Sequence, residues 1–231
     1  MVIINCGIQK SGTTLIFQYQ LSIQQLSGKR NAQKVFNSKS IGGFVNKINF
    51  RIFVFILFVR IFYGSFVVKI HHIPNIYIRL LVFFGIAKVT FCLRDPRDTS
   101  LSMFDHANKI RQGLSKPNGF ENIHSLEQSV NVIKNSILWH NWLKYGNAIF
   151  IKFEHLNNDK FYFLKYITYY CKIYNLSDEV LREIVTKYDK KSHNLNKAES
   201  YRYKNELDKN KLEWINKELK EQILEMGYKL E

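Results

Sequence analysis

The chain has 231 residues, of which 46% are apolar and 15% aromatic, and this composition excludes a disordered polymer because it supplies ample material for a core. It carries 34 Lys and Arg against 19 Asp and Glu, a net charge of +15 that favours an anionic partner: nucleic acid, a phospholipid surface or a small polyanion. The length lies within the range of one α/β domain, so we expect a single domain over 1–231.

The first part of the chain has the pattern of a strand, a loop and a helix. Val2 to Cys6 is short and apolar, and Thr13 to Leu26 carries apolar residues at helical spacing.

The apolar start is too short for a signal peptide, so we expect a cytoplasmic location. Cys6, Cys92 and Cys171 are widely spaced and form no CxxC pair, so we expect reduced structural thiols.

A second apolar stretch runs from Ile52 to Val68 and is interrupted by Arg60. A spanning helix needs roughly 20 apolar residues, and a charge in the middle of this stretch argues against one. We therefore expect a buried or surface-lying helix. This interpretation leaves contact with a membrane surface through 50–68 open, without a span.

Strands and helices are expected to alternate along the rest of the first two thirds of the chain. Such alternation predicts parallel strands joined by right-handed crossovers, with ligands bound at the carboxyl ends of the strands. We expect strands at Phe66 to Ile70, Lys88 to Leu93 and Ala148 to Phe153, and helices at Ile76 to Phe84, Pro96 to Ile110 and Glu127 to Lys144.

These elements predict an α/β fold of three layers, with a central, mostly parallel sheet flanked by helices. From about residue 158 the chain is helix-rich and increasingly charged. Two polar, turn-forming segments, 37–43 and 113–125, are candidates for mobile lids, and an ordinary connecting loop is the alternative for each.

The loop between the first strand and the first helix, Gly7 to Thr14, has the features of a phosphate site. Its backbone N–H groups and the N-terminus of the helix point at one small volume that favours an anion. Lys10 precedes Ser11 and Gly12, whereas the Walker pattern places Lys after its second Gly. Such a loop suits a single terminal phosphate without a metal better than it suits a triphosphate with magnesium.

The run Lys10-Ser11-Gly12-Thr13-Thr14 resembles the 5'-phosphosulfate loop of the cytosolic and Golgi sulfotransferases. This resemblance covers roughly residues 2–156 and implies a P-loop-like fold. It also implies transfer of a sulfuryl group from 3'-phosphoadenosine 5'-phosphosulfate (PAPS) to a hydroxyl or amine. In that family Lys10 would stabilise the charge that develops as the sulfuryl group leaves, and the 5'-phosphate would be held by Ser11, Gly12, Thr13 and Thr14.

A second candidate phosphate site follows the third predicted strand. Arg94 leaves the strand end and Ser102 lies about two helical turns further on, so both can meet one ligand. The pair resembles the 3'-phosphate site of the same family. Two phosphate sites at successive strand ends fit a doubly phosphorylated adenosine better than ATP. We expect Arg97 and Asp98 to form a structural ion pair or cap.

Two histidines at the end of the second strand are candidates for a general base, because imidazole titrates near neutrality. The strand Val67-Val68-Lys69-Ile70-His71 resembles the family's strand that ends in Val-Lys-x-His, which implies that His71 is the base. His72 remains the alternative. Lys69 either orients the site or is only a charge at the strand end.

The chain departs from the family's pattern where the adenine would bind. Leu15 stands where many members have a stacking Trp, and Phe153 and His155 replace the Tyr and Asp of a Tyr-Glu-Asp-Leu strand end. The usual basic, glycine-containing loop near the C-terminus is represented only by 196–204. There Arg202 or Lys204 could reach the 3'-phosphate, and a solvated basic segment is the alternative.

Three other interpretations stay open. A nucleotide kinase or triphosphatase would need a Walker Lys, which the loop lacks. A non-catalytic basic module for nucleic acid or glycans would need aromatic residues interleaved with Lys and Arg on one exposed face. A sulfotransferase that binds its donor without turnover is the third. We expect no bound metal and no nucleic acid, and an acceptor that is a small molecule, a glycan or a lipid.

Overall fold

A computed structural model describes residues 1–28, 30–40, 42–117, 119–191 and 199–230. Its strands are β1 (Val2–Gly7), β2 (Phe66–Ile70), β3 (Ala87–Leu93) and β4 (Ile149–Lys152). Its helices are α1 (Thr13–Leu26), α2 (Gln33–Asn37), α3 (Phe50–Phe62), α4 (Ile76–Phe83), α5 (Pro96–Arg111), α6 (Leu126–Lys134), α7 (Leu138–Tyr145), α8 (Phe153–Asn158), α9 (Lys160–Tyr170), α10 (Asp178–Lys191), α11 (Tyr203–Glu206), α12 (Lys209–Glu218) and α13 (Lys220–Glu225).

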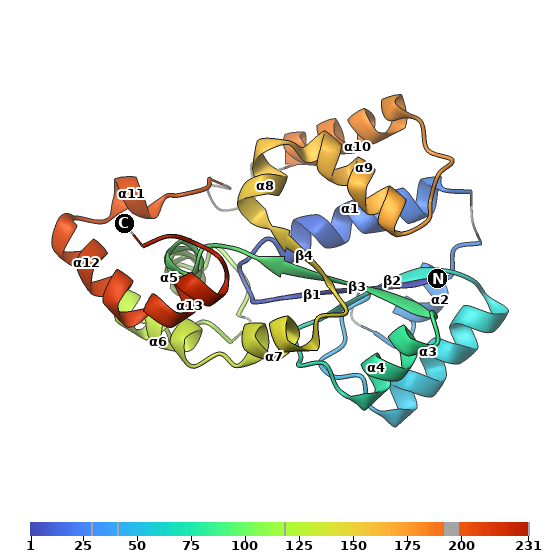
Figure 1. Ribbon diagram of the computed structural model, residues 1–231, viewed down its shortest axis with the longest axis horizontal. Helices are drawn as coiled ribbons and strands as arrows, with labels where there is room; N and C mark the ends of the chain where they lie inside the picture. The colour runs from blue at the N-terminus through green and yellow to red at the C-terminus, as the bar shows by residue number, and fades with distance from the viewer. Residues whose placement is uncertain (29, 41, 118, 192–198, 231) are drawn as a thin grey trace.

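The four strands form one parallel sheet in the order β2-β1-β3-β4, with β1 and β3 in the centre. Helices cover both faces, with α1, α9 and α10 on one side and α3, α4 and α7 on the other (Figure 1). Alternate residues of β1 enter the two cores: Ile3 packs with α1 and α9, whereas Val2 and Ile4 pack with α3 to α7. The predicted three-layer α/β fold is confirmed.

Strand β2 is an edge strand of the sheet, and the segment that leads from α1 to α3 covers it. Ser65 pairs with the backbone of Arg30 and Ala32 at 2.8 Å, and Lys69 pairs with Gly43 and Val45 at 2.9 and 3.0 Å. Between them the side-chain amide of Gln33 bonds both backbone groups of Val67, accepting from its N–H at 2.8 Å and donating to its carbonyl at 3.0 Å. Every second residue of this edge is therefore paired.

One predicted helix is wrong: the stretch from Glu127 to Lys144 forms two helices, α6 and α7, separated at 135–137. Asn135 and Ser136 end the first helix with N–H bonds back to Asn131 and Ile133, as short polar residues often do. The break lets Trp142 of α7 turn under β3, where its indole donates to the carbonyl oxygen of His72 at 2.8 Å. The other predicted strands and helices are present with small differences at their ends.

Helix α3 lies on the surface, which is one of the two positions that the sequence left open for this apolar stretch. Ile56 and Val59 are buried against the sheet, while Phe50, Val54 and Phe58 are exposed. Within the described parts of the chain, no helix is long and apolar enough to cross a membrane.

The pairing of Gln33 with Val67 generates a stability prediction. Gln33→Ala should lower the free energy of unfolding by about 2 to 4 kcal/mol, because it leaves a buried N–H and a buried carbonyl without partners. Urea denaturation measures this difference. Gln25→Ala, at an exposed position of α1, is the control and should change the value by less than about 0.5 kcal/mol. Equal effects of the two substitutions would show that the Gln33 amide does not support the sheet edge.

Candidate active site

The ends of β1, β2 and β3 bring three predicted segments to one edge of the sheet. The register pairs Cys6 with Ile70 and Gly7 with Cys92, so the loop after β1 lies between His71 and Arg94. The predicted phosphate loop, the candidate base and the candidate arginine are therefore neighbours because of strand pairing alone.

The loop after β1 is a tight turn that two glycines make feasible. A Cβ on Gly7 would lie 2.6 Å from Thr13 and 2.7 Å from the carbonyl oxygen of Cys92, which leaves no room for a side chain. Gly12 has a φ of 93°, and a Cβ there would lie 2.5 Å from the ring of Phe153. Lys10 also adopts a left-handed φ, 71°, a conformation that costs a non-glycine residue on the order of 1 kcal/mol and that often marks functional sites.

Ser11 holds this loop in shape. Its hydroxyl lies 2.6 Å from the carbonyl oxygen of Ile8 and 3.2 Å from that of Cys92, and its N–H also donates to Ile8. The side chain is completely buried. Its hydroxyl proton is therefore used within the protein, and Ser11 can offer an outside ligand only an acceptor.

Helix α1 begins at the loop without a side-chain cap, because its N-cap residue is Gly12. The N–H groups of the first turn and the positive end of the helix dipole are thus left for an anion. Thr13 is buried, and the hydroxyl of Thr14 accepts a hydrogen bond of 2.8 Å from the ammonium group of Lys69. Lys69 is a residue whose place in the site the sequence left undecided.

Two lysines, Lys10 and Lys69, place positive charge around the loop. Burial, together with Arg94 and Lys109, lowers the pKa of Lys10 to about 8. Burial lowers the pKa of Lys69 to about 8 as well. Neither lysine forms an ion pair within the described residues. An anion bound here would favour the charged form of both lysines and so oppose the effect of burial.

Arg94 connects β3, the loop and the C-terminal segment. Its guanidinium donates to the carbonyl oxygens of Glu199 at 2.7 Å and Lys10 at 3.5 Å, and it lies 4.5 Å from the ring centroid of Phe153. Asp98 is 3.6 Å away. The Nε of this buried arginine has no hydrogen-bond partner among the described residues, so one donor is left over for a ligand.

Ser102 is buried on α5, and it forms no hydrogen bond with Arg94 in the described part of the chain. Arg97 and Asp98 were expected to form a structural ion pair or cap, and within the described residues they do not pair with each other. Arg97 instead binds both carboxylate oxygens of Asp95, at 2.9 and 2.7 Å, and Asp98 accepts from the N–H groups of 201 and 203. Arg97 and Asp98 are therefore both structural. Arg97 is buried beside Asp95, which caps α5.

The expectation of a solvated basic segment near the C-terminus is wrong at Arg202. This side chain is buried and binds Asp105 and Glu206, with a bond of 2.8 Å to the latter. Its charge is therefore already neutralised. Positions 196–198 of the same predicted segment lie outside the described residues.

The ring of His71 is oriented by the loop. Its Nδ1 lies 2.7 Å from the carbonyl oxygen of Gly7, and because a carbonyl can only accept, Nδ1 must carry the proton. Nε2 is then an unprotonated acceptor. Burial and the charge of Lys69 lower the pKa of His71 to about 4, so the imidazole is neutral at pH 7. The Nδ1 of His72 likewise lies 2.6 Å from a carbonyl oxygen, that of Ile73.

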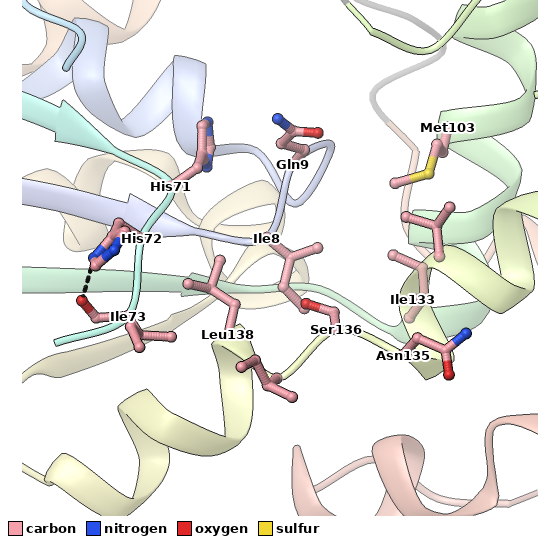
Figure 2. A pocket seen from close by; sticks show the side chains of 12 residues that line it. Ile8, Gln9, His71, His72, Ile73, Met103, Ile133, Asn135, Ser136 and Leu138 are labelled. Carbon is pink, nitrogen blue, oxygen red and sulfur yellow. Dashed lines mark hydrogen bonds between the residues drawn. The ribbon is translucent and has the colours of Figure 1, made fainter. Parts of the chain in front are cut away.

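A cavity of about 510 Å³ opens beside these histidines. Figure 2 shows His71, His72 and Ile73 on one side, Met103 and Ile133 on the other, and Ile8 between them. The break between α6 and α7 contributes the remaining wall through Asn135, Ser136 and Leu138. This is the size of a small-molecule site, mostly apolar with a few polar groups.

The sequence missed two features of this site. Phe153 lacks the hydroxyl of the family's Tyr, yet its ring fills the space over Gly12 and supports Arg94. The gap between α6 and α7, which lines the cavity, was hidden inside a predicted continuous helix. No group of three or more His, Cys, Asp or Glu that could hold a metal is found within the described ranges.

The buried position of His71 generates a titration prediction. The C2 proton of His71, assigned by its loss in His71→Gln, should titrate in NMR with a midpoint near pH 4 in the ligand-free protein. Burial favours the neutral ring, so the midpoint lies below the ordinary value of about 6.5. A midpoint at or above the ordinary value would contradict the buried, loop-bound ring described above.

No protein-family model and no curated protein matches the chain by sequence. Solved structures match it by fold. Mouse sulfotransferase SULT7A1 complexed with PAP has a TM-score of 0.62 at 15% identity, over 96% of this chain and 84% of that one. Retinol dehydratase with androsterone and PAP scores 0.59, and with retinol and PAP 0.62, each at 14% identity over 99% of this chain and 82% of that one. The chain therefore has the fold of the PAPS-dependent sulfotransferases.

Proposed function

We propose that this protein is a sulfotransferase, which moves a sulfuryl group from PAPS to a hydroxyl or amine of a small-molecule acceptor. The observation that carries the proposal is the position of His71, whose Nδ1 is bound to the carbonyl of Gly7 while the side chain lines an apolar cavity. A neutral imidazole thus stands where a phosphate loop and an acceptor cavity meet. That is the arrangement a group transfer between two bound molecules requires.

The residues of the loop fit the donor. PAPS carries negative charge at its 5' and 3' ends. The loop offers a helix start without a side-chain cap and Lys10, which has no ion-pair partner among the described residues. We assign the 5'-phosphate to the backbone N–H groups of 12–14 and to Lys10, with Ser11 holding the loop in shape. We assign the 3'-phosphate to Arg94, whose buried Nε lacks a partner among the described residues, and to Ser102. When bound, the donor supplies the sulfuryl group and leaves as the 3',5'-bisphosphate.

His71 would take the proton of the acceptor hydroxyl or amine on Nε2 while the acceptor atom forms its bond to sulfur. Lys10 and the first-turn N–H groups of α1 would stabilise the negative charge that appears on the departing phosphate oxygen as its bond to sulfur breaks. The charge of the donor would also raise the pKa of His71 from about 4 toward neutrality, because an anion nearby favours the protonated ring. The base would thus gain strength when the donor is in place.

The cavity supports a small acceptor with an apolar body and one polar group. Ile73, Met103 and Ile133 would surround the body, and His71 and Gln9 would meet the polar end. The solved structures of retinol dehydratase hold androsterone or retinol together with PAP. A glycan would find few hydrogen-bonding groups in such a cavity.

Calorimetry with adenosine 3',5'-bisphosphate tests the donor site. We expect binding without magnesium, at least tenfold weaker binding after Lys10→Ala, and loss of most affinity after Arg94→Ala, because each removes a charge-assisted contact of about 1.5 to 3 kcal/mol. Lys39→Ala, at an exposed lysine, is the matched control and should bind like the parent protein. A clear preference for ATP with magnesium would instead favour the nucleotide kinase.

Substitution of the two histidines tests the assignment of the base. His71→Gln should lower the turnover of radiolabelled PAPS by at least a hundredfold while binding of the bisphosphate is retained, since general-base catalysis contributes about 10² to 10⁴. His72→Gln should lower turnover by less than tenfold. The opposite pattern would make His72 the base, and a protein that binds the bisphosphate but turns over no acceptor would favour a non-catalytic role.

A further inference from the structure

Helices α3 and α4 present an apolar surface that no part of the described chain covers. The two helices contact one another through Phe53 and Tyr77, whose ring centroids are 5.4 Å apart, and they lie side by side below the sheet (Figure 1). The α3–α4 face consists of exposed side chains that recur at helical spacing: Phe50, Val54, Phe58, Ile61 and Phe62 on α3, and Ile76, Phe83 and Phe84 on or beside α4.

The exposure on this face is large for side chains of this kind. Phe83 is 82% exposed and Ile61 70% exposed, and several neighbours exceed one half. A surface helix normally turns its apolar side inward and its polar side to water. Helix α3 is apolar on both sides, except at Arg51 and Arg60, so its outer stripe serves no purpose in the core. A group of large exposed apolar side chains on two neighbouring helices marks an interaction site.

Positive charge surrounds the face. Lys47, Arg51 and Arg79 are exposed and Arg60 is half-buried, and none of them forms an ion pair with a carboxylate within the described residues. The whole segment 1–94 contains 12 Lys and Arg and no Asp or Glu. The net charge of +15 is therefore concentrated in the part of the chain that contains both helices.

This combination identifies the partner. Phenylalanine and isoleucine beside arginine and lysine, on a helix that lies along the surface, are typical of peripheral helices that enter the headgroup region of a bilayer with anionic lipids. Helix α3 has 13 residues and is about 20 Å long at 1.5 Å per residue, too short to span a bilayer of roughly 30 Å. A second copy of this chain would bring arginines against arginines, because no carboxylate stands in the segment.

We propose that the α3–α4 face binds the surface of a membrane that contains anionic phospholipids, with the two helices lying flat in the headgroup region. The aromatic and aliphatic side chains enter the boundary of the acyl chains, and Lys47, Arg51 and Arg79 meet the lipid phosphates. This proposal is independent of the sulfotransferase proposal, because no residue of the face belongs to the phosphate loop or to the acceptor cavity.

Flotation with lipid vesicles tests the proposal on the full chain. We expect the protein to float with vesicles of phosphatidylcholine containing about a third phosphatidylserine, and to stay behind with phosphatidylcholine alone. Binding should weaken as salt rises, since the attraction of exposed charges is screened. The double substitution Ile61→Asn with Phe83→Asn should lower the partition coefficient at least tenfold, and Lys47→Gln with Arg51→Gln should lower it on anionic vesicles.

Two control proteins match these substitutions. Tyr162→Asn with Tyr169→Asn removes two similarly exposed aromatic side chains from α9 on the opposite side of the sheet, and Lys217→Gln with Lys220→Gln removes two exposed charges from the C-terminal helices. Both should float like the parent protein. The circular dichroism spectrum, which all variants should share with the parent protein, shows that each is folded. This control does not use the donor, so the test is separate from that of the enzymatic proposal.

Three outcomes would overturn the membrane proposal. The first is no flotation with anionic vesicles at low salt. The second is flotation that the α3–α4 substitutions leave unchanged, or that the controls lower equally. The third is a dimer in analytical ultracentrifugation that Ile61→Asn with Phe83→Asn dissociates, without any lipid effect, which would assign the face to a second copy or a protein partner instead.

Discussion

The parallel pairing of β1 with β2 and β3 is the constraint on which the site depends. It sets Gly7 beside Cys92, and Cys6 beside Ile70, the residue before His71. The carbonyl of Gly7 can therefore fix the imidazole while the carbonyl of Cys92 anchors Ser11. A slip of one residue in either pairing would turn each strand's side chains to the opposite face and would separate these groups. The covering of β2 by Gln33 and its neighbours protects this register at the edge of the sheet.

The sequence was sufficient for the parts of the fold that follow from local periodicity. The strands, the loop after β1 and the helices α1 and α5 begin and end close to the predicted residues, because apolar alternation and a Pro at the first turn of α5 are strong local signals. The resemblance to sulfotransferases also predicted the fold. The roles assigned to Lys10, Arg94 and His71 remain predictions, although strand pairing does bring the three segments together.

What the sequence could not show depends on contacts between distant residues. The break between α6 and α7 falls at Asn135 and Ser136 and accompanies the packing of Trp142 under β3, whereas periodicity alone continued the helix through it. The pairing of Arg202 with Asp105 could not be predicted, because the two residues lie 97 positions apart in the sequence. The sequence shows only that Phe153 lacks a hydroxyl. Its role as a support for the loop becomes visible only when β4 is placed beside β3.

The distribution of charge along the chain links the phosphate loop to the α3–α4 face. Carboxylates begin at Asp95, and among the described residues they neutralise arginines that hold α5 and the C-terminal segment in place. Of the lysines and arginines before that point, only Arg94 has an ion-pair partner in the part that the structure describes. Like charges without partners disfavour the compact state, and ligands that bind only the folded protein offset this. The unpaired cations therefore have an energetic reason to bind anions, whether as a polyanion at the loop or as lipid phosphates along α3 and α4.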